Sequence, residues 1–370
     1  TYGTNSSYNY LINGSKPVIV KAPGLVAPDF TWETVTQMDF GFDASFLNNR
    51  LTGTFDWYRR NTKDMLVAGA TLPATLGASV PKSNSADMKT IGWELSLGWN
   101  DRLENGFSYW VKGVLSDYQA TITKYAGNDA GFYSQSDDDG KYYVGQKIGE
   151  IWGYHSNGLF QSDDEAATID QSELYAGKWG AGDVKYEDLD NDGKITKGEE
   201  TIYNPGDKSI IGNKTPRYQF GITVGFDYKN FDFEMFWQGT GKRDYMLSGA
   251  QFWGFTSQWD VPYTPALDYW TETNTDAYFP RPGWQNGGNR VTSDRYLQSA
   301  AYGRLKNLTV GYTIPKNLTT KWGISRLRLY VTGENLLTIT PLNDAFDPET
   351  LGGMTYPINR KVAIGLNLTL

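Results

Sequence analysis

The segment DLDNDGKITKGE, residues 188–199, carries oxygen-bearing side chains at the spacing of a calcium-binding loop. Three aspartates alternate at positions 1, 3 and 5, Gly193 then permits a sharp bend, and an acid at position 12 closes the loop as a bidentate ligand. The apolar residue at position 8, Ile195, is suited to anchor the loop in a core. The expected ligands are, in loop order, Asp188, Asp190, Asp192, the backbone carbonyl of Lys194, Thr196 (often through water) and Glu199.

An alternative for this segment is a solvated acidic turn with Asn191, Asp192 and Gly193 at its tip. No amphipathic helix flanks the segment, which disfavours a calcium sensor that switches between two conformations. The hypothesis carried forward is a structural Ca²⁺ ion that stiffens a long surface loop.

Other side chains offer little for catalysis. His155 is the only histidine, so we expect neither a histidine metal site nor a Ser-His-Asp triad. The acidic clusters at 136–140 and 162–165 show no sign of the paired carboxylates of a glycosidase and are interpreted as solvated loop charges. We therefore predict that the protein is not an enzyme.

The segment QFWGFTSQWD, residues 251–260, concentrates aromatic residues. They could pack a small core within their own loop, stack on sugar rings of a substrate, or contact a protein partner. The candidate ligand-binding residues are Trp253, Phe255 and Trp259.

Composition limits the classes of protein that could position these residues. The 370 residues include 25 Tyr, 13 Trp and 41 Gly but no Cys, which favours β-structure and excludes a disulfide scaffold. A dispersed net charge of -8 disfavours nucleic-acid binding. The mean hydropathy of -0.51 excludes helical membrane proteins only, because half of each membrane β-strand is polar.

Nine segments alternate apolar and polar residues with the period of a β-strand. In the clearest, residues 217–228, Phe220, Ile222 and Val224 share one face while glycines and polar residues share the other. The nine predicted strands are 37–46, 50–58, 90–99, 106–115, 217–228, 230–239, 307–314, 326–333 and 361–370.

The connections between these strands alternate between short and long. Short turns are expected near 47–49, 100–105, 229–230 and 315–325, and long connections at about 59–89, 116–216, 239–300 and 334–360. One end of the sheet then carries all the bulk, as in outer-membrane barrels with short periplasmic turns and long extracellular loops. A soluble sandwich has no reason to sort its loops in this way.

The strand faces favour a membrane barrel as well. A dry core that enclosed the acids of the polar faces would be costly, whereas a wet lumen accepts them. These acids are Asp39, Asp43, Asp56, Asp227, Asp232 and Glu234. Aromatic residues near strand ends fit interfacial girdles, namely Trp57, Tyr58, Trp99, Phe226, Tyr228, Phe231 and Trp237. Because barrels of this type have even strand counts, we expect further strands before Thr1.

The sequence resembles the C-terminal part of the SusC/RagA family of TonB-dependent outer-membrane transporters of Bacteroidetes. The resemblance covers almost the whole chain, 1–370. The stretches that carry it are FTWETVTQMDFGFDASFLNNRLTGTFDWYRRNTKDML (30–65), KTIGWELSLGWND (89–101), EIWGYHSNGLFQSDDE (150–165), GDVKYEDLDNDGKIT (182–196) and those at 210–244 and 302–340.

The resemblance implies an all-β fold, the C-terminal strands of a 22-stranded antiparallel transmembrane barrel whose plug domain and TonB-contacting segment we do not find in this sequence. It implies import of glycans or peptides across the outer membrane, with a SusD-like surface lipoprotein as lid, TonB as energy source and outer-membrane lipid around the barrel. The alternative that we retain is a soluble or surface carbohydrate-binding β-module with a structural calcium loop.

Overall fold

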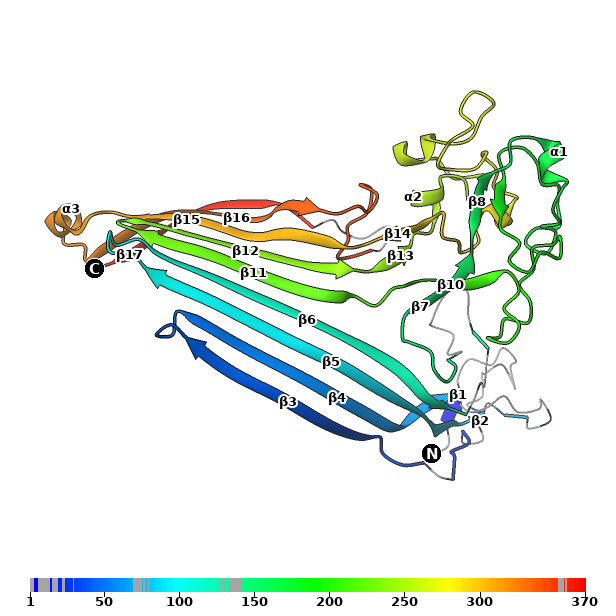
Figure 1. Cartoon of the computed structure of the whole chain (residues 1–370), viewed down its shortest axis with the longest axis horizontal. Helices are drawn as coiled ribbons and strands as arrows, with labels where there is room; N and C mark the ends of the chain where they lie inside the picture. The colour runs from blue at the N-terminus through cyan, green and yellow to red at the C-terminus, as the bar shows by residue number, and fades with distance from the viewer. Residues whose placement is uncertain are drawn as a thin grey trace.

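A nine-stranded antiparallel sheet, referred to below as the wall, dominates the computed structural model (Figure 1). The structure describes residues 3–5, 14, 19–21, 24–28, 30–68, 75, 77, 78, 80–126, 128, 131, 132, 142–351, 356 and 358–370. The strands of the wall are, in spatial order, β17 (Lys361–Thr369), β16 (Arg326–Ile339), β15 (Tyr302–Thr313), β12 (Phe231–Lys242), β11 (Arg217–Tyr228), β6 (Ser108–Tyr125), β5 (Lys82–Arg102), β4 (Leu51–Ala68) and β3 (Thr34–Phe46).

All nine predicted strands are present, but three of them are much longer than predicted. β4 continues to Ala68, β5 begins at Lys82 and β6 continues to Tyr125. The predicted long connections at 59–89 and 116–216 therefore shorten to 69–81 and 126–216. The alternation that defines the predicted strands stops where one face no longer meets an apolar environment, although the backbone pairing continues.

The two ends of the wall differ as the connection lengths predict. One end, the turn end, carries only residues 47–50, 103–107, 229–230 and the segment 314–325, which contains α3 (Lys316–Thr319) and η5 (Thr320–Trp322). The other end, the loop end, carries the remaining folded segments (Figure 1). These are β7 (Glu150–Tyr154), β8 (Ser156–Leu159), α1 (Asp163–Ala166), β9 (Val184–Tyr186), β10 (Lys208–Asn213), β13 (Asp244–Met246), α2 (Ala250–Trp253), η3 (Thr264–Leu267), η4 (Gly287–Arg290) and β14 (Leu297–Ser299).

A small two-stranded sheet completes the described chain. The short strands β1 (Gly3–Asn5) and β2 (Ile19–Lys21) pair with each other. No helix within the described ranges has the length and apolar character to span a membrane.

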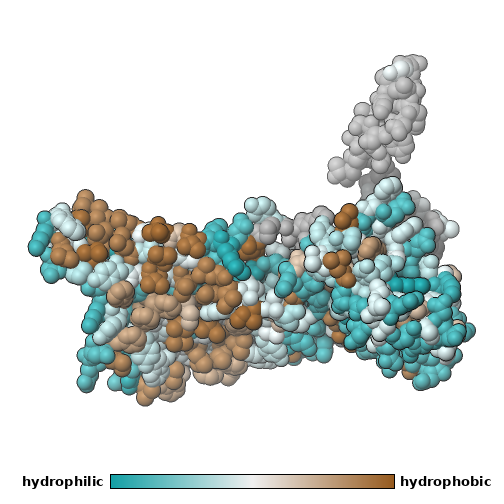
Figure 2. Space-filling model, turned by 90° about the horizontal axis from the view of Figure 1, so that it is seen from above, coloured by the Kyte–Doolittle hydropathy of each residue, from teal (hydrophilic) through white to brown (hydrophobic). Residues whose placement is uncertain are grey.

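One face of the wall, the apolar face, is a continuous band of large apolar side chains. The register aligns Phe42 with Phe55 and Phe55 with Leu95, and the band continues across the wall to Ile364. Phe40 is 76% exposed and Ile364 83% exposed. Figure 2 shows hydrophobic residues gathered over the strands and hydrophilic residues over the loop end. Burial of this band requires an apolar surrounding outside the chain.

The opposite face, the polar face, carries all six acids predicted for it. Each of these acids is next in its strand to a residue of the apolar face and therefore points to the other side of the sheet. Glycines alternate with these polar residues and accept aromatic rings from neighbouring strands. Tyr58 lies over Gly92, Trp110 over Gly225 and Tyr330 over Gly365, each so close that a Cβ atom on the glycine would clash with the ring. The rings therefore lie along the polar face.

Aromatic residues border the apolar band as predicted, with one exception. Trp57 and Trp237 lie on its loop-end side, whereas Trp99, Phe226, Tyr228 and Phe231 lie on its turn-end side. Tyr58 belongs to the polar face, since it is opposite Asp39 and Gly92. The prediction for Tyr58 rested on its place at the end of the predicted strand 50–58, but adjacent residues of a strand point to opposite faces, so Tyr58 and Trp57 do not share a face.

The loop end has a conventional buried core. Its centre includes Tyr186, Phe252 and Tyr296, all at most 1% exposed, and Ile195 belongs to the same cluster. The core joins segments that are distant in sequence, since Phe346, from the connection between β16 and β17, packs there too. Loop segments that are distant in sequence thus share a core at the loop end of the wall.

Candidate functional sites

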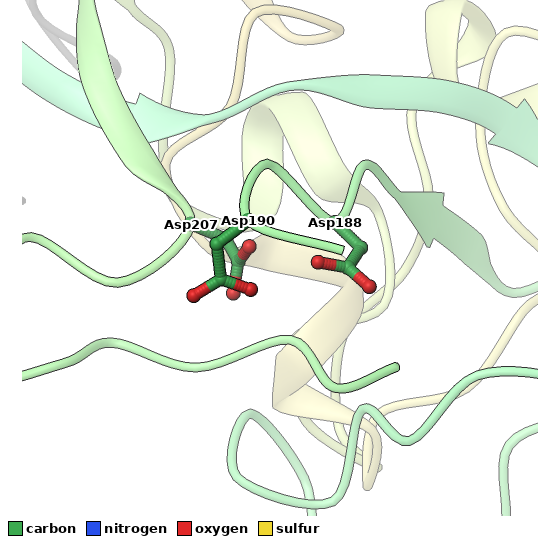
Figure 3. A group of neighbouring side chains, drawn as sticks. All are labelled: Asp188, Asp190 and Asp207. Atoms are coloured by element: carbon green, nitrogen blue, oxygen red, sulfur yellow. The ribbon is translucent and has the colours of Figure 1, made fainter. Parts of the chain in front are cut away.

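Three carboxylates converge in the loop after β9. Ligand oxygens of Asp188, Asp190 and Asp207 all lie within 4.8 Å of one another. Figure 3 shows the three carboxylates turned to the same side of the loop. Three carboxylates at such separations form an oxygen cluster of the kind that hard divalent cations prefer.

Backbone hydrogen bonds shape this loop. Asp188 accepts from the N–H groups of Asn191 (2.7 Å) and Gly193 (2.8 Å), which curls the chain around its carboxylate. Asn191 and Gly193 have φ values of 61° and 84°, so the sharp bend expected at Gly193 is present. Ile195 is 1% exposed and anchors the loop in the core, as predicted for position 8.

The electrostatics of the loop reflect accumulated negative charge. Desolvation raises the pKa of Asp188, but three backbone N–H donors led by Gly193 outweigh it, so the pKa is lowered. The pKa of Asp190 is raised, first by desolvation and then by the charges of Asp192, Asp207 and Asp188. Among the ion pairs of the described residues, none neutralises Asp188, Asp190 or Asp207. A bound cation would relieve this repulsion.

Asp207 is the member of the cluster that the sequence pattern missed. It is fully buried and accepts hydrogen bonds from the N–H groups of Leu189 (2.8 Å) and Thr196 (2.7 Å). The chain returns to the loop because Gly198 and Gly206 approach so closely that a Cβ atom on either would meet the other's backbone. The only sequence signal for this return is the turn-forming pair Pro205-Gly206 ahead of an acid.

The predicted ligand set and the observed cluster overlap in part. Asp188 and Asp190 are shared, whereas Asp192 and Glu199 are outside the cluster. Asp192 instead accepts from the N–H group of Lys194 (2.8 Å), and Glu199 is an exposed residue. Thr196 contacts the cluster through its N–H group and Asp207. No helix flanks the loop within the described residues, as expected.

His155 forms an arrangement that counting histidines did not anticipate. Its Nδ1 lies 2.7 Å from Asp294 Oδ2, and its Nε2 lies 2.7 Å from Ser209 Oγ. These contacts follow the Asp-His-Ser order of a catalytic triad. The expectation that a chain with one histidine has no such triad therefore needed the structure as a test. Ser209, however, lies in β10, where its backbone pairs with Gly153 of β7, and the Asp294 side chain is 39% exposed. The contacts hold β7, β10 and the segment before β14 together.

The aromatic candidates of 251–260 occupy different environments. Trp253 belongs to the core, with its ring centroid 4.5 Å from that of Tyr296. Trp253 and Phe255 border a cavity of about 20 Å³, which has room for a water molecule but not for a sugar. Trp259 is 83% exposed. Of the acidic clusters, 162–165 begins α1, with Ser162 as its N-cap, and 136–140 is outside the described residues.

The polar face holds a broad groove near the turn end, with a volume of about 630 Å³. Six charged residues contribute to its lining, and two of them form an ion pair in which Arg328 donates to both oxygens of Asp232. The other charged lining residues are Asp227, Lys229, Glu234 and Arg326. Such a surface suits contact with water or a polar protein surface rather than with lipid.

Comparisons with known proteins agree with this architecture. The family model for TonB dependent receptor-like β-barrels matches residues 1–336. The TonB-dependent receptor P3 of Formosa agariphila is 30% identical over 379 residues, an alignment that covers 93% of this chain and 35% of that protein. The TonB-dependent receptor SusC of Bacteroides thetaiotaomicron is 25% identical, with 99% of this chain and 35% of SusC covered.

A solved structure of the RagAB peptide transporter shares the fold, with a TM-score of 0.75 at 22% identity, and covers 100% of this chain and 38% of that chain. The chain spans about a third of the length of the curated relatives it matches. The wall, with its apolar and polar faces, and the match over residues 1–336 show that the chain belongs to the TonB-dependent receptor-like β-barrel family.

Proposed function

We propose that the chain forms the C-terminal barrel strands and extracellular loops of an outer-membrane transporter that imports glycans or peptides. A SusD-like surface lipoprotein closes its mouth, and TonB supplies the energy through a plug and an N-terminal segment in the rest of the protein. The observation that carries this proposal is the pairing of an exposed apolar face with a charged polar face on one sheet. A barrel with lipid outside and a wet lumen inside requires both faces.

The relatives support the class of activity. SusC and RagAB are named as a TonB-dependent receptor and a peptide transporter. Loops collected at one end fit a transporter that contacts substrate and lid on the cell surface. The retained alternative, a carbohydrate-binding module in water, leaves the apolar band exposed at a large free-energy cost.

Topology provides the test, because the chain contains no Cys and a single introduced Cys is a unique label. Glu187→Cys is at the loop end and Glu104→Cys at the turn end, and both positions are exposed. In intact cells that produce the full-length protein without other accessible Cys, a membrane-impermeant maleimide should label Glu187→Cys only. Equal labelling of both positions would contradict the barrel and favour the surface module.

We also propose that a structural Ca²⁺ ion is held in the loop after β9. Asp188, Asp190 and Asp207 supply the carboxylates, and the motif adds the Lys194 carbonyl. The ion would fasten the loop to the start of β10, because Asp207 directly precedes that strand.

Asp192 and Glu199 belong only to the twelve-residue pattern and Asp207 only to the observed cluster, so variants separate the two. If the cluster holds the ion, Asp188→Asn and Asp207→Asn should each weaken calcium binding to the purified full-length protein at least tenfold by titration calorimetry. Glu199→Gln should leave calcium binding unchanged. The reverse result for Asp207→Asn and Glu199→Gln would restore the twelve-residue pattern, and no calcium binding to the parent protein would refute the site.

A further inference from the structure

A group of cations occupies the apolar face just beyond the tryptophan border. Trp57 of β4 and Trp93 of β5 are directly opposite each other. Two residues further along β4, Arg59 has the same orientation as Trp57, and on β5 Lys89 has the same orientation as Trp93. At about 3.3 Å per residue, Arg59 is about 7 Å, Lys89 about 13 Å and Lys63 about 20 Å beyond the tryptophans, towards the loop end.

The register brings these cations together. Asn61 is opposite Lys89, so Arg59 and Lys63, two residues to either side of Asn61, are diagonal neighbours of Lys89 within reach of long side chains. Arg59 and Lys63 are exposed, and Lys89 is half-buried. Arg59 Nε donates to Asn61 Oδ1 (3.3 Å).

Among the described residues, acids do not neutralise this group. None of the ion pairs in the described part of the chain includes Arg59, Lys63 or Lys89. Asp87, the acid nearest to Lys89 along β5, accepts at Oδ1 from the N–H group of Asp64 (3.0 Å). Ile148, from the loop segment before β7, packs on the other side of these strands, where it contacts the small core of Ala86 and Ile122.

We propose that Arg59, Lys63 and Lys89 bind the phosphate group of a phosphorylated lipid in the outer leaflet. The site depends on the membrane orientation given under the proposed function. Tryptophans mark the interface between hydrocarbon and headgroups, and long cationic side chains just beyond them reach lipid phosphates while their aliphatic stems cover apolar surface. The site is continuous with the apolar band, and its positive charge complements the phosphate.

β4 offers a matched control. Arg60 is the next residue after Arg59 and is likewise exposed, but it points to the polar face with Tyr58. Arg60→Gln removes the same charge from the same strand on the opposite side of the barrel wall. Any effect of net charge or of strand stability alone would therefore be shared by Arg59→Gln and Arg60→Gln.

The test is native mass spectrometry of the full-length transporter in mild detergent, with phosphatidic acid and phosphatidylcholine in competition. The parent protein and Arg60→Gln should prefer phosphatidic acid. The preference should fall roughly fivefold for each cation removed, so Arg59→Gln with Lys89→Gln should nearly abolish it.

Two results would overturn the site. One is an unchanged preference in the double variant, and the other is displacement of phosphatidic acid by inorganic phosphate at equal concentration, which indicates a simple anion site. The Cys-labelling pattern of the same parent protein is read separately. Correct labelling with unchanged lipid preference refutes the lipid site alone, whereas incorrect labelling refutes the barrel orientation itself.

Discussion

The wall and the loop end bury their side chains according to opposite rules. In the wall the large apolar residues are exposed, with Ile364 at 83%, and charged residues such as Asp232 face the interior groove. At the loop end Phe252 and Tyr296 are at most 1% exposed, and charges lie mainly outside. The same chain therefore follows the usual hydrophobic-core arrangement only where water surrounds it.

The contrast shows that the solvent, rather than the residue type, determines which face of an element is hidden. Strands β4 to β6 run from the wall into the loop end. Their loop-end halves lack the apolar face but remain paired. The small core of Ala86, Ile122 and Tyr125 then forms on the opposite side of these strands.

The largest expected effect tests whether the loop end is a separate core. Phe252→Ala removes a ring that packs 5.2 Å from Phe279, and should cost about 3–5 kcal/mol of loop-end stability. Hydrogen exchange should accelerate at the loop end and stay slow in the wall. The exposed Trp259→Ala is the control and should have little effect. Equal acceleration in both regions would mean that they unfold as one unit.

A second change tests the wall in the same way. Val331→Arg places a charge on the apolar face and should cost about 2–4 kcal/mol near the middle of a bilayer. Thr332→Arg, one residue on, places the same charge on the polar face and should cost less than half as much. Unfolding of the full-length protein from lipid bilayers by urea measures both. Similar costs would remove the distinction between the two faces.

The smallest effect concerns polar contacts at the loop end. His155→Ala removes the hydrogen bonds to Asp294 and Ser209, but water replaces them because the His155 side chain is 34% exposed and that of Asp294 39%. We expect a loss of about 1 kcal/mol, confined to the loop end. Thermal unfolding followed by exchange of β7 and β10 amides would show it. A loss as large as that of Phe252→Ala would make this contact a central support.

The strands of the wall were readable from sequence because lipid and lumen impose a strict period of two. The extensions of β4, β5 and β6 towards the loop end could not be predicted, because residues such as Asn61 and Lys63 do not form an alternation of apolar and polar side chains. The calcium loop was readable as a local pattern of aspartates. Asp207 was not, because it joins the cluster through a chain return that depends on the contact of Gly198 with Gly206.

The aromatic segment illustrates a different limit. Spacing alone does not separate Trp253, in the core, from Trp259, on the surface, because neither follows a strand period. Trp253 is buried because its ring packs against Phe279 and Tyr296, which come from later segments of the chain.

The rings of Tyr58, Trp110 and Tyr330 lie over Gly92, Gly225 and Gly365 on the polar face. Each of these glycines leaves the space that the neighbouring ring occupies. A methyl group at any of the glycines would push the ring away from the wall, so the residue with the smallest side chain controls how far the largest rings project from the polar face.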